Sequence, residues 1–424
     1  MRLITISFFG VSFPLPNSKR VQLSAPSATA LKHILSEYGE VYEAGKSFGI
    51  YRIKGYDIDF CMPRSERKIG DAHTSFDVTV DPFLGTKEAS RRRDFTINSL
   101  MENVLTGEII DHWGGMFDLR NGVIRHIDDE KFKEDALRVF RAARFAAKLN
   151  FMVAEETVEL CQSIDTTKLS SERVFSEMAN VLMGSNTPSV FFELLEEMSQ
   201  LHFWFKELQD CIGVMQNQHF HREGDVWTHT MLVLDNAAIK RQEAQRPLEF
   251  MLAAICHDLG KPMCTSEDPT GIIHSVGHEE AGVAVAKEFL SRLTSEKKII
   301  SYVLNMVELH GEPHAKANST ARVKSTNKMF DKSIAPSDLV LLSRCDNLGK
   351  LPSADDTREF LEERLRVFEA TMSKPCVMGR DLIAAGLKPD ERFSELLSLA
   401  HKLRLAGVDK ESALKQVLAA ARQR

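Results

Sequence analysis

The sequence lacks the features that mark secreted, disulfide-bonded and membrane-embedded proteins. Its seven cysteines are odd in number and widely spaced, and no two of them form a C-x-x-C pair. This pattern favours reduced thiols in a cytoplasmic protein. No apolar run reaches the length that a membrane-spanning helix needs, and there is no internal repeat or long low-complexity tract. The sequence therefore predicts a globular protein without a membrane partner.

The sequence also lacks an excess of positive charge. Its formal net charge is −6 over 424 residues, so an RNA partner would have to bind a local basic patch rather than the protein as a whole. Apolar residues make up 43% and charged residues 27% of the chain, which is typical of a soluble globular protein. The length suffices for about two to four domains.

The N-terminal stretch MRLITISFFGVSFPLP has an ambiguous character. One arginine followed by mostly apolar residues weakly resembles a signal peptide. The alternative is a first β-strand, or a stretch not native to the fold. We favour the alternative because the rest of the chain has an intracellular character.

The hydrophobic pattern divides the chain into a head that contains strands and a longer helical part. Up to about residue 125, β-rich runs such as SFGIYRI and SFDVTV alternate with turn sequences, and SATALKHILSE has the cap and spacing of a helix. From about residue 130, apolar residues recur every three or four positions. We therefore expect an α+β fold with an atypical N-terminal segment, a head, a helical neck, a histidine-bearing helical domain and a helical tail, at residues 1–27, 28–130, 131–215, 216–350 and 351–424.

Two aspartates in the head are candidates for a catalytic metal site. Asp57 and Asp59 are separated by one residue in YDIDF, and residues two apart on a strand point to the same face of a sheet. Paired carboxylates hold the Mg²⁺ ions that phosphoryl transfer requires. If both residues lie in one strand, they predict a nucleotidyl-transfer site.

A basic run follows in ASRRRDFTINSL, residues 89–100. The planar guanidinium of arginine suits phosphate oxygens, so Arg93 is a candidate for contact with a nucleoside triphosphate or an RNA backbone. Asp94 and Asn98 are four residues apart, which is one turn if a helix begins there. The alternative is a solvated basic turn that caps a helix.

The segment KEDALRVFRAARF, residues 133–145, has the pattern of an amphipathic helix. Its polar positions recur every third residue and would form one stripe: Asp135, Arg138, Arg141 and Arg144. Its apolar positions would pack inward: Leu137, Val139, Phe140 and Phe145. An aspartate and an arginine one turn apart offer the acceptor and the donors that reading a base edge requires. The alternative is an ordinary ion pair within the helix.

Together these motifs resemble the class II tRNA nucleotidyltransferases, the CCA-adding enzymes and the related bacterial poly(A) polymerases. RRDFTINSL matches the family's RRDFTIN motif, IIDHWGGMFDL its D-x-x-x-G-x-x-D-L stretch, and EDALR its EDxxR motif, with Ala136 where proline is usual. The resemblance covers about residues 37–200. It implies a DNA polymerase beta-type nucleotidyltransferase head, followed by neck, body and tail helices. It also implies tRNA, CTP and ATP as substrates, rather than DNA, and Mg²⁺ in the head.

By this resemblance Arg93 contacts the nucleotide phosphates, and Asp135 and Arg138 act as a protein template for CTP and ATP, with Arg141 nearby. The family also begins with a G-G-x-V-R-D loop and a D-x-D pair, which cradle the triphosphate and hold both metals. Neither motif stands upstream of residue 40. On the family's register YDIDF is a later strand, in which Asp59 takes the place of the third carboxylate. The first 27 or so residues therefore indicate an altered or displaced start of the coding sequence, which the upstream DNA read in all frames would test.

A constellation of histidines and aspartates follows in the helical part. His229 is succeeded by the adjacent His257 and Asp258 in ICHDLGKP, and later by Asp346. This order resembles the HD metal-dependent phosphohydrolases. Neutral imidazoles together with carboxylates suit Ni²⁺, Mn²⁺, Co²⁺, Fe or Mg²⁺ better than structural zinc. Such a metal activates water and stabilises charge on a phosphoryl group. The resemblance implies 2′,3′-cyclic phosphodiesterase, 2′-nucleotidase or phosphatase activity.

Other polar residues near this constellation are candidates for supporting roles. His278 and His310 would complete a second metal site or bind substrate phosphate, and Lys261 is a candidate phosphate contact. Glu223 and Asp225 stand just before the first histidine and are candidates for orienting it or for touching substrate.

Three functional hypotheses follow. In the first, a CCA-adding enzyme carries an HD phosphohydrolase domain, and the tRNA 3′-hydroxyl attacks the nucleotide α-phosphate in line. In the second, the head has lost transfer activity because it lacks the first metal-binding carboxylates, and it only binds tRNA. The third, a non-catalytic RNA-binding protein, is disfavoured by the complete HD motif. Basic residues in the tail would either hold the tRNA elbow or form an ordinary solvated face: Arg358, Arg364, Arg366, Lys402 and Arg404.

Overall fold

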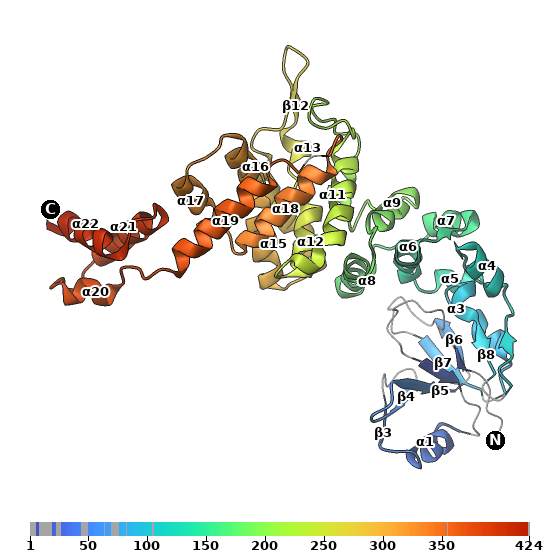
Figure 1. Cartoon of the computed structure of the whole chain (residues 1–424). Helices are drawn as coiled ribbons and strands as arrows, with labels where there is room; N and C mark the ends of the chain where they lie inside the picture. Colours follow the sequence, from blue (N-terminus) through green and yellow to red (C-terminus); the bar gives the residue numbers. More distant parts are fainter. Residues whose placement is uncertain are drawn as a thin grey trace. The chain divides into compact units, whose positions relative to one another are not determined.

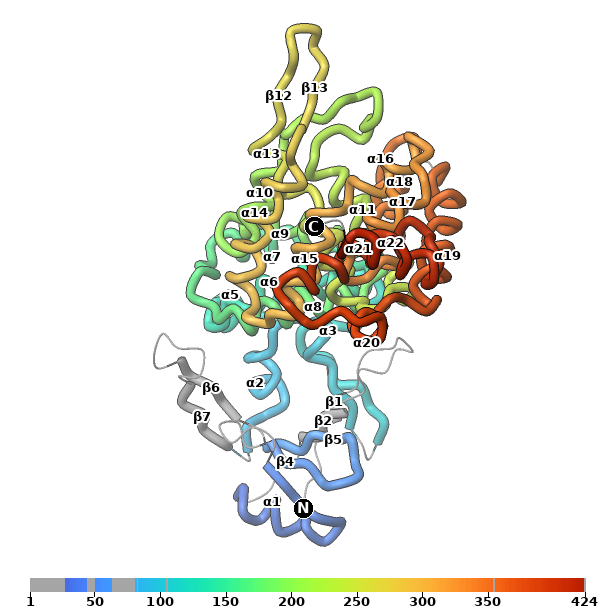
Figure 2. The backbone as a smooth tube through the Cα atoms, turned by 90° about the vertical axis from the view of Figure 1, so that its left-hand side faces the viewer, coloured from blue at the N-terminus to red at the C-terminus, as the bar shows by residue number. Residues whose placement is uncertain are grey.

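The computed structural model describes two compact units (Figures 1 and 2). Unit 1 comprises residues 1–181 and 190–203, and unit 2 comprises residues 182–189 and 204–424. The described residues are 6–7, 19–22, 27–43, 50–62, 64–68, 76–81, 83–103, 106–353 and 355–422. Most of the atypical N-terminal segment predicted at residues 1–27 therefore lies outside the described residues.

Seven short strands form a mixed sheet in unit 1: β1 (Ile6–Ser7), β2 (Lys19–Gln22), β3 (Val41–Glu43), β4 (Ile50–Ile53), β5 (Ile58–Cys61), β8 (Met101–Glu102) and β9 (Ile109–Ile110). Their order is β3-β4-β5-β2-β1-β8-β9. Strand β5 lies inside this sheet, parallel to β2 and antiparallel to β4. Strands β6 (Arg64–Lys68) and β7 (Phe76–Val80) form a separate antiparallel pair.

Helix α1 (Ala28–Ser36) packs on β4 because its sequence carries both a cap and an apolar face. The Ser27 hydroxyl accepts a hydrogen bond from the Ala30 N–H at 3.1 Å, as expected for a helix start. Leu31 and Leu35 are buried against the inward-facing side chains of β4. This cluster forms the apolar core beside β5, the strand that carries Asp59.

The chain between residues 86 and 197 is mainly helical. The helices are α2 (Thr86–Arg91), α3 (Thr96–Ser99), α4 (Gly115–Asn121), α5 (Asp129–Lys133), α6 (Leu137–Leu149), α7 (Glu155–Gln162), α8 (Ser171–Gly184) and α9 (Ser189–Glu197). A short parallel pair, β10 (Val123–Ile124) and β11 (Met152–Val153), flanks α6 in sequence. The four apolar positions predicted for the inner face of α6 are all buried.

Unit 2 is built from helices around one buried helix. The helices are α10 (Lys206–Gln209), α11 (Val226–Lys240), η1 (Arg241–Glu243), α12 (Pro247–Cys256), α13 (Lys261–Cys264), α14 (His278–Leu293), α15 (Lys297–Leu309), α16 (Gly311–Asn318), α17 (Val323–Lys332) and α18 (Pro336–Gly349). Helix α12 packs against α11, α15 and α18, and its residues 250–256 are all buried. His257 and Asp258 directly follow this buried helix, so they lie in the interior of the unit.

A narrow hairpin projects from unit 2 between α13 and α14. It consists of β12 (Ser266–Glu267) and β13 (Ile273–His274), which pair antiparallel (Figures 1 and 2). Both views place the loop that precedes α11 beside this hairpin.

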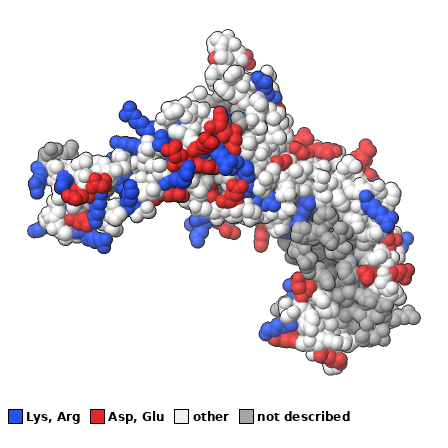
Figure 3. Space-filling model, viewed as in Figure 1, with Lys and Arg blue, Asp and Glu red and all other residues white. Residues whose placement is uncertain are grey.

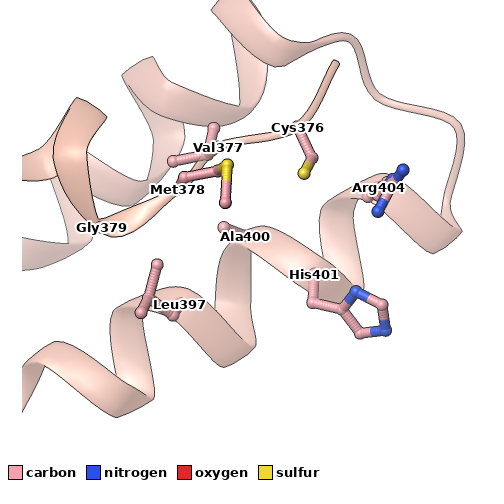
Figure 4. Close-up of a pocket in the computed structure, with 8 residues that line it drawn as sticks. All are labelled: Cys376, Val377, Met378, Gly379, Leu397, Ala400, His401 and Arg404. Atoms are coloured by element: carbon pink, nitrogen blue, oxygen red, sulfur yellow. The ribbon is translucent and has the colours of Figure 1, made fainter. Parts of the chain in front are cut away.

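The tail of unit 2 contains a small helical module. Its helices are α19 (Arg358–Ser373), α20 (Gly379–Ala384), α21 (Phe393–Leu405) and α22 (Lys410–Arg422). Leu382, Ala400 and Val417 belong to its apolar core. A pocket of about 230 Å³ lies between α21 and the segment that leads into α20, and His401 and Arg404 line it (Figure 4).

Several basic side chains of the tail bond within the tail itself. Arg358 pairs with Glu362 at 2.7 Å, and Arg404 donates to the Lys374 carbonyl at 3.2 Å. On the face drawn in Figure 3, basic and acidic residues alternate over these helices. These contacts support the interpretation of an ordinary solvated face for this part of the molecule.

The predicted α+β fold class is confirmed, and the predicted helices are found close to their expected bounds. The main difference in helix limits is at α6, which begins at Leu137 rather than before Asp135. Among the described residues, no helix combines the length and the apolar character needed to cross a membrane.

Candidate metal centre and nucleotide site

Asp258 lies at the centre of a cluster of imidazoles in unit 2. Its Oδ2 is 3.2 Å from Nε2 of His257 and 3.7 Å from Nε2 of His229. Its Oδ1 is 3.4 Å from Nε2 of His278 and 3.5 Å from Nε2 of His310. One buried carboxylate is therefore shared by two pairs of imidazoles.

A second carboxylate and two lysines complete the polar centre. Asp346 on α18 places Oδ1 3.0 Å from Nε2 of His229 and Oδ2 3.4 Å from Nζ of Lys350. Nζ of Lys261 lies 2.6 Å from Oδ2 of Asp258. The cluster thus combines four imidazoles, two carboxylates and two ammonium groups.

The backbone fixes which nitrogen each imidazole presents to the centre. Three of the rings donate Nδ1–H to the carbonyl oxygen three residues earlier, at 2.7 or 2.8 Å: His257, His278 and His310. The ring of His229 instead contacts Oε1 of Glu223 through Nδ1 at 2.9 Å. Because Nδ1 carries the proton in each case, the lone pair of Nε2 is free to bind a metal. This contact assigns Glu223 the orienting role suggested by its position in the sequence.

Two glycines allow the helices to approach closely enough to assemble the centre. A Cβ atom on Gly349 would lie 2.5 Å from Cγ2 of Val233, so glycine permits α18 to bring Asp346 next to His229 on α11. A Cβ atom on Gly260 would overlap the carbonyl oxygen of His278 and lie 2.5 Å from the backbone nitrogen of Gly282. Gly260 therefore permits the turn after Asp258 to touch the start of α14.

Replacement of Gly260 by alanine should destabilise unit 2 and disturb the centre. The atoms in the way belong to the backbone, which cannot rotate aside, so we expect a loss of about 1–3 kcal/mol of unfolding free energy. Thermal unfolding followed by circular dichroism measures this loss. Gly85→Ala is the matched control because a Cβ there meets no atom within 4 Å. Equal stability of the two variants would contradict the steric role of Gly260.

The carboxylates of the centre are held ionised by their cationic neighbours. Burial alone would raise the pKa of Asp258, but His257 and Lys261 outweigh it and hold the pKa well below its usual value. Burial would likewise raise the pKa of Asp346, and Lys350 and His229 hold it well below the usual value. Both carboxylates are therefore ionised and present negative charge to the imidazole nitrogens.

The donor atoms present are those that a divalent metal requires. Nε2 of His278 and Nε2 of His310 are 3.2 Å apart. Each ring is already oriented by its Nδ1–H hydrogen bond, so neither ring needs a proton on Nε2. Nε2 of His257 is buried without a hydrogen bond among the described residues. The ligand atoms of His229, His257 and Asp346 lie within 4.8 Å of one another, as do those of Asp258, His278 and His310. A cation on each side of Asp258 would satisfy these atoms together.

The histidine motif thus assembles as the sequence predicts. The four residues expected to hold a metal converge, and His278, His310 and Lys261 join them at Asp258. Asp225 has a role other than orienting His229 or touching substrate: its carboxylate caps α11 by accepting the Thr228 N–H at 2.8 Å. Sequence reasoning missed two members: Lys350, one turn after Asp346, and His221, whose Nδ1 lies 2.7 Å from Oε1 of Glu223.

Asp57 and Asp59, the aspartates expected to pair in the head, differ in secondary structure and in burial. Strand β5 begins at Ile58, so Asp57 precedes the strand that carries Asp59, and the condition for pairing the two carboxylates along one strand is not met. Asp57 is exposed, whereas Asp59 is buried. Nε of Arg52 on β4 donates to Oδ1 of Asp59 at 2.6 Å. One oxygen of the buried carboxylate is therefore bonded to a guanidinium within the sheet.

The basic run is joined to α6 by a buried ion pair. Nε of Arg141 donates to Oδ2 of Asp94 at 2.8 Å, and Nδ2 of Asn98 donates to Oδ1 of Asp94 at 2.8 Å. Asp94 lies just before α3 and Asn98 within it, as the helix-start interpretation expected. The guanidinium of Arg93 donates to the Asn98 carbonyl at 2.7 Å. Asp94, Asn98 and Arg141 thus hold two motifs together within unit 1.

Asp135 and Arg138, the two residues expected to read the base, bond to partners other than those predicted. Asp135 precedes α6 and bonds Arg173 at 2.9 and 3.1 Å rather than pairing within the helix. It lines a pocket of about 280 Å³ together with Arg173 and Lys168. Arg138 donates to the carbonyl oxygens of Lys131 at 2.7 Å and Arg92 at 2.5 Å. These partners come from segments 38 to 46 residues away or from α5, so helical spacing could not indicate them.

The third motif supports this arrangement. The hydroxyl of Thr96 donates to Oδ2 of Asp118 at 2.7 Å, and Nε of Arg125 lies 3.2 Å from the same carboxylate. A Cβ on Gly115 would overlap the Thr96 carbonyl, so this position requires glycine for close packing. The D-x-x-x-G-x-x-D-L stretch is therefore part of the support beneath RRDFTIN.

Two known families match the head and the histidine-bearing part of the chain. Residues 23–125 match the family described as Poly A polymerase head domain, and residues 226–350 match the HD domain family. The multifunctional CCA protein of Actinobacillus pleuropneumoniae serotype 5b is 32% identical over 334 residues, which cover 76% of this chain and 79% of that protein. The multifunctional CCA protein of Nitrosococcus oceani is 31% identical over 361 residues, covering 83% of this chain and 86% of that protein.

The fold is also found among solved structures. A Thermotoga maritima CCA-adding enzyme complexed with tRNA is similar with a TM-score of 0.62 and 17% identity, over 96% of this chain and 88% of that chain. A CCA-adding enzyme complexed with CTP gives a TM-score of 0.64 at 16% identity, over 96% of this chain and 86% of that chain. The sequence relationship extends over the greater part of both partners. The chain therefore belongs to the family of multifunctional CCA proteins, class II CCA-adding enzymes that carry an HD domain.

Proposed function

We propose that this protein adds or repairs the 3′-terminal CCA of tRNA from CTP and ATP, and that its HD domain is a metal-dependent phosphohydrolase. The relationship to the multifunctional CCA proteins supports the first activity. The observation that carries the second is Asp258, one buried carboxylate that faces two pairs of imidazole nitrogens. A structural site that holds a single ion does not require a carboxylate shared between two sets of ligands.

In the HD domain, His229, His257, Asp258 and Asp346 would hold one divalent metal. His278 and His310 would hold a second with Asp258, or would bind substrate phosphate. Bound metal supplies an activated water and charge stabilisation at phosphorus. Lys350 and Lys261 add positive charge for the phosphate oxygens. The imidazole and carboxylate donors suit Ni²⁺, Mn²⁺, Co²⁺ or Mg²⁺.

In the head, Arg93 would contact the nucleotide phosphates, and Asp135 and Arg138 would select the base. Asp94, Asn98 and Arg141 would position these groups through the buried contacts between RRDFTINSL and α6. The in-line attack joins the tRNA 3′-oxygen to the α-phosphorus and releases pyrophosphate.

Among the described head residues, Asp57 and Asp59 do not form the paired carboxylates that were expected to hold Mg²⁺. Asp59 is bonded to Arg52, Asp57 is exposed, and none of the groups of described residues that could hold a metal lies in the head. This specific observation favours a second candidate function, in which the head binds tRNA without transferring nucleotides and the HD domain alone is catalytic.

Two single variants separate these candidates. Purified protein is incubated with tRNA lacking its 3′ end, Mg²⁺ and labelled CTP or ATP, and separately with a 2′,3′-cyclic phosphate and Mn²⁺ or Ni²⁺. The proposal expects Asp135→Ala, which removes a residue proposed to select the base, to abolish incorporation only and His257→Ala to abolish hydrolysis only. Hydrolysis without incorporation in the unaltered protein would support the second candidate. Failure of both assays would leave an RNA-binding protein.

The domain limits and the compartment complete the proposal. We assign the head to residues 28–130, the neck to 131–215, the HD domain to 216–350 and the tail to 351–424, after an atypical segment at 1–27. All seven cysteines are free and five of them are buried, which supports a cytoplasmic location.

A further inference from the structure

The centre around Asp258 is closed on one side and open on the other. His229, His257, Asp258 and His310 are each 4% exposed or less. The side chains of His221, His278, Asp346 and Lys350 are between 14% and 18% exposed. A substrate must therefore approach over these last four groups.

Exposed apolar side chains stand within two residues, in the sequence, of three of these four groups. Phe220 precedes His221 and is 62% exposed, Val276 stands two residues before His278 and is 85% exposed, and Leu351 follows Lys350 and is 48% exposed. We refer to Phe220, Val276 and Leu351 as the apolar rim. Exposed apolar residues cost free energy in water, so a set of them around a polar catalytic centre indicates a ligand with an apolar part.

The members of the rim belong to segments that are tied to one another. The backbone N–H of Leu351 donates to Oε2 of Glu223 at 2.8 Å, and the N–H of Arg222 donates to the Leu351 carbonyl at 3.3 Å. Val276 follows the projecting hairpin, beside which the loop that carries Phe220 lies in both Figure 1 and Figure 2. The segment after α18 is therefore bonded to the loop before α11, and the hairpin that precedes Val276 lies beside the same loop.

We propose that the apolar rim binds the base of the terminal nucleotide of an RNA strand while its 2′,3′-cyclic phosphate lies on the HD centre, with Phe220 as the stacking residue. This inference rests on the proposed phosphohydrolase function and adds to it the residue that determines the substrate. Every nucleobase has a flat apolar face, and stacking on an exposed aromatic ring is how single-stranded RNA is commonly held.

Positive charge near the rim suits a polynucleotide. Arg222 is exposed directly after Phe220 and His221, and Nζ of Lys350 lies at the open side. These groups would attract the phosphates that precede the terminal nucleotide. The rim therefore matches an RNA end, with an apolar base next to a charged backbone, better than it matches a free nucleotide.

Kinetics with three substrates test this proposal: adenosine 2′,3′-cyclic phosphate, 1-O-methylribose 2′,3′-cyclic phosphate without a base, and a tetranucleotide that ends in a 2′,3′-cyclic phosphate. We expect Phe220→Ala to lower kcat/KM about tenfold on the two substrates that carry a base. The baseless substrate should be unaffected. Phe220→Trp should retain activity because it keeps an aromatic face, and Phe220→Leu should not.

Phe117→Ala is the matched control, because Phe117 is 69% exposed and lies on α4 in the other unit. Equal effects of Phe220→Ala on all three substrates would overturn the stacking role. Equal kcat/KM of the unaltered protein for the mononucleotide and the tetranucleotide would overturn the assignment to an RNA end. If the unaltered protein hydrolyses none of them, the proposed phosphohydrolase fails. Calorimetric binding of adenosine 2′-phosphate then still tests the rim, and unchanged affinity in Phe220→Ala would refute it.

Discussion

Replacement of Asp258 by asparagine should abolish hydrolysis of 2′,3′-cyclic phosphates, with a loss in kcat on the order of 1,000-fold or more. The reason is that both oxygens of this carboxylate face imidazole nitrogens, so the change removes a charged ligand from both sides of the centre. Tight binding of Ni²⁺ or Mn²⁺ should be lost together with activity. Hydrolysis assays and metal analysis of the purified variant measure these two effects independently.

The control for this variant is His274→Ala. His274 lies on the hairpin four residues before His278, but its ring contacts Asp268 rather than the centre. It should keep both metal and hydrolysis. Chelation of the metal should inactivate the unaltered protein, and added metal should restore it. An Asp258→Asn protein that binds metal normally and hydrolyses the substrate would show that the centre lies elsewhere.

Replacement of Arg141 by methionine should destabilise unit 1 by about 3–5 kcal/mol, because it leaves a buried carboxylate without its cation. Asp94 is 8% exposed and bonds Arg141 and Asn98. The double variant Asp94→Asn with Arg141→Met should recover much of this loss, since it removes the unpaired charge. Hydrogen exchange of the α6 amides, measured by mass spectrometry, reports this stability for unit 1 separately.

The same pair has a defined dependence on pH. Burial alone would raise the pKa of Asp94, but Arg141, Asn98 and Arg138 outweigh it and lower the pKa from its ordinary value. The pair therefore stabilises unit 1 above a pH of about 4, where the aspartate of the unfolded chain is ionised, and its contribution disappears as the pH falls through the folded-state pKa.

Exposed Arg120→Ala is the control for Arg141→Met and should change stability by less than about 0.5 kcal/mol. An equally small effect of Arg141→Met would contradict the proposed link between the two motifs.

The convergence of the side chains in the candidate metal centre was largely predictable because short-range geometry constrains most of it. His257 and Asp258 are adjacent, and three of the histidines stand at helix ends where Nδ1 reaches the carbonyl three residues before. The contact of His229 with Asp346 spans 117 residues, and only the order of the motif indicated it. The roles of Lys350 and His221 depend on the packing of α18 and the loop before α11, which no local spacing reveals.

The head was less predictable because its contacts cross between strands and helices. Alternation along YDIDF predicted paired carboxylates, but the strand starts one residue after Asp57, and Arg52 on the neighbouring strand bonds Asp59. Helical spacing predicted that Asp135 and Arg138 share a helix face, but Asp135 precedes the helix and bonds Arg173. The burial of the apolar side of α6 was predicted correctly because it depends on periodicity alone.

Sequencing the 3′ ends of tRNA after incubation with the protein tests whether it adds CCA. The tRNA is supplied without its CCA end, together with CTP, ATP and Mg²⁺, and Asp258→Asn protein is used so that the HD centre cannot alter the product. We expect the tRNA to gain C, C and A at its 3′ end. Unchanged 3′ ends, from a preparation in which the unaltered protein hydrolyses a 2′,3′-cyclic phosphate, would contradict it.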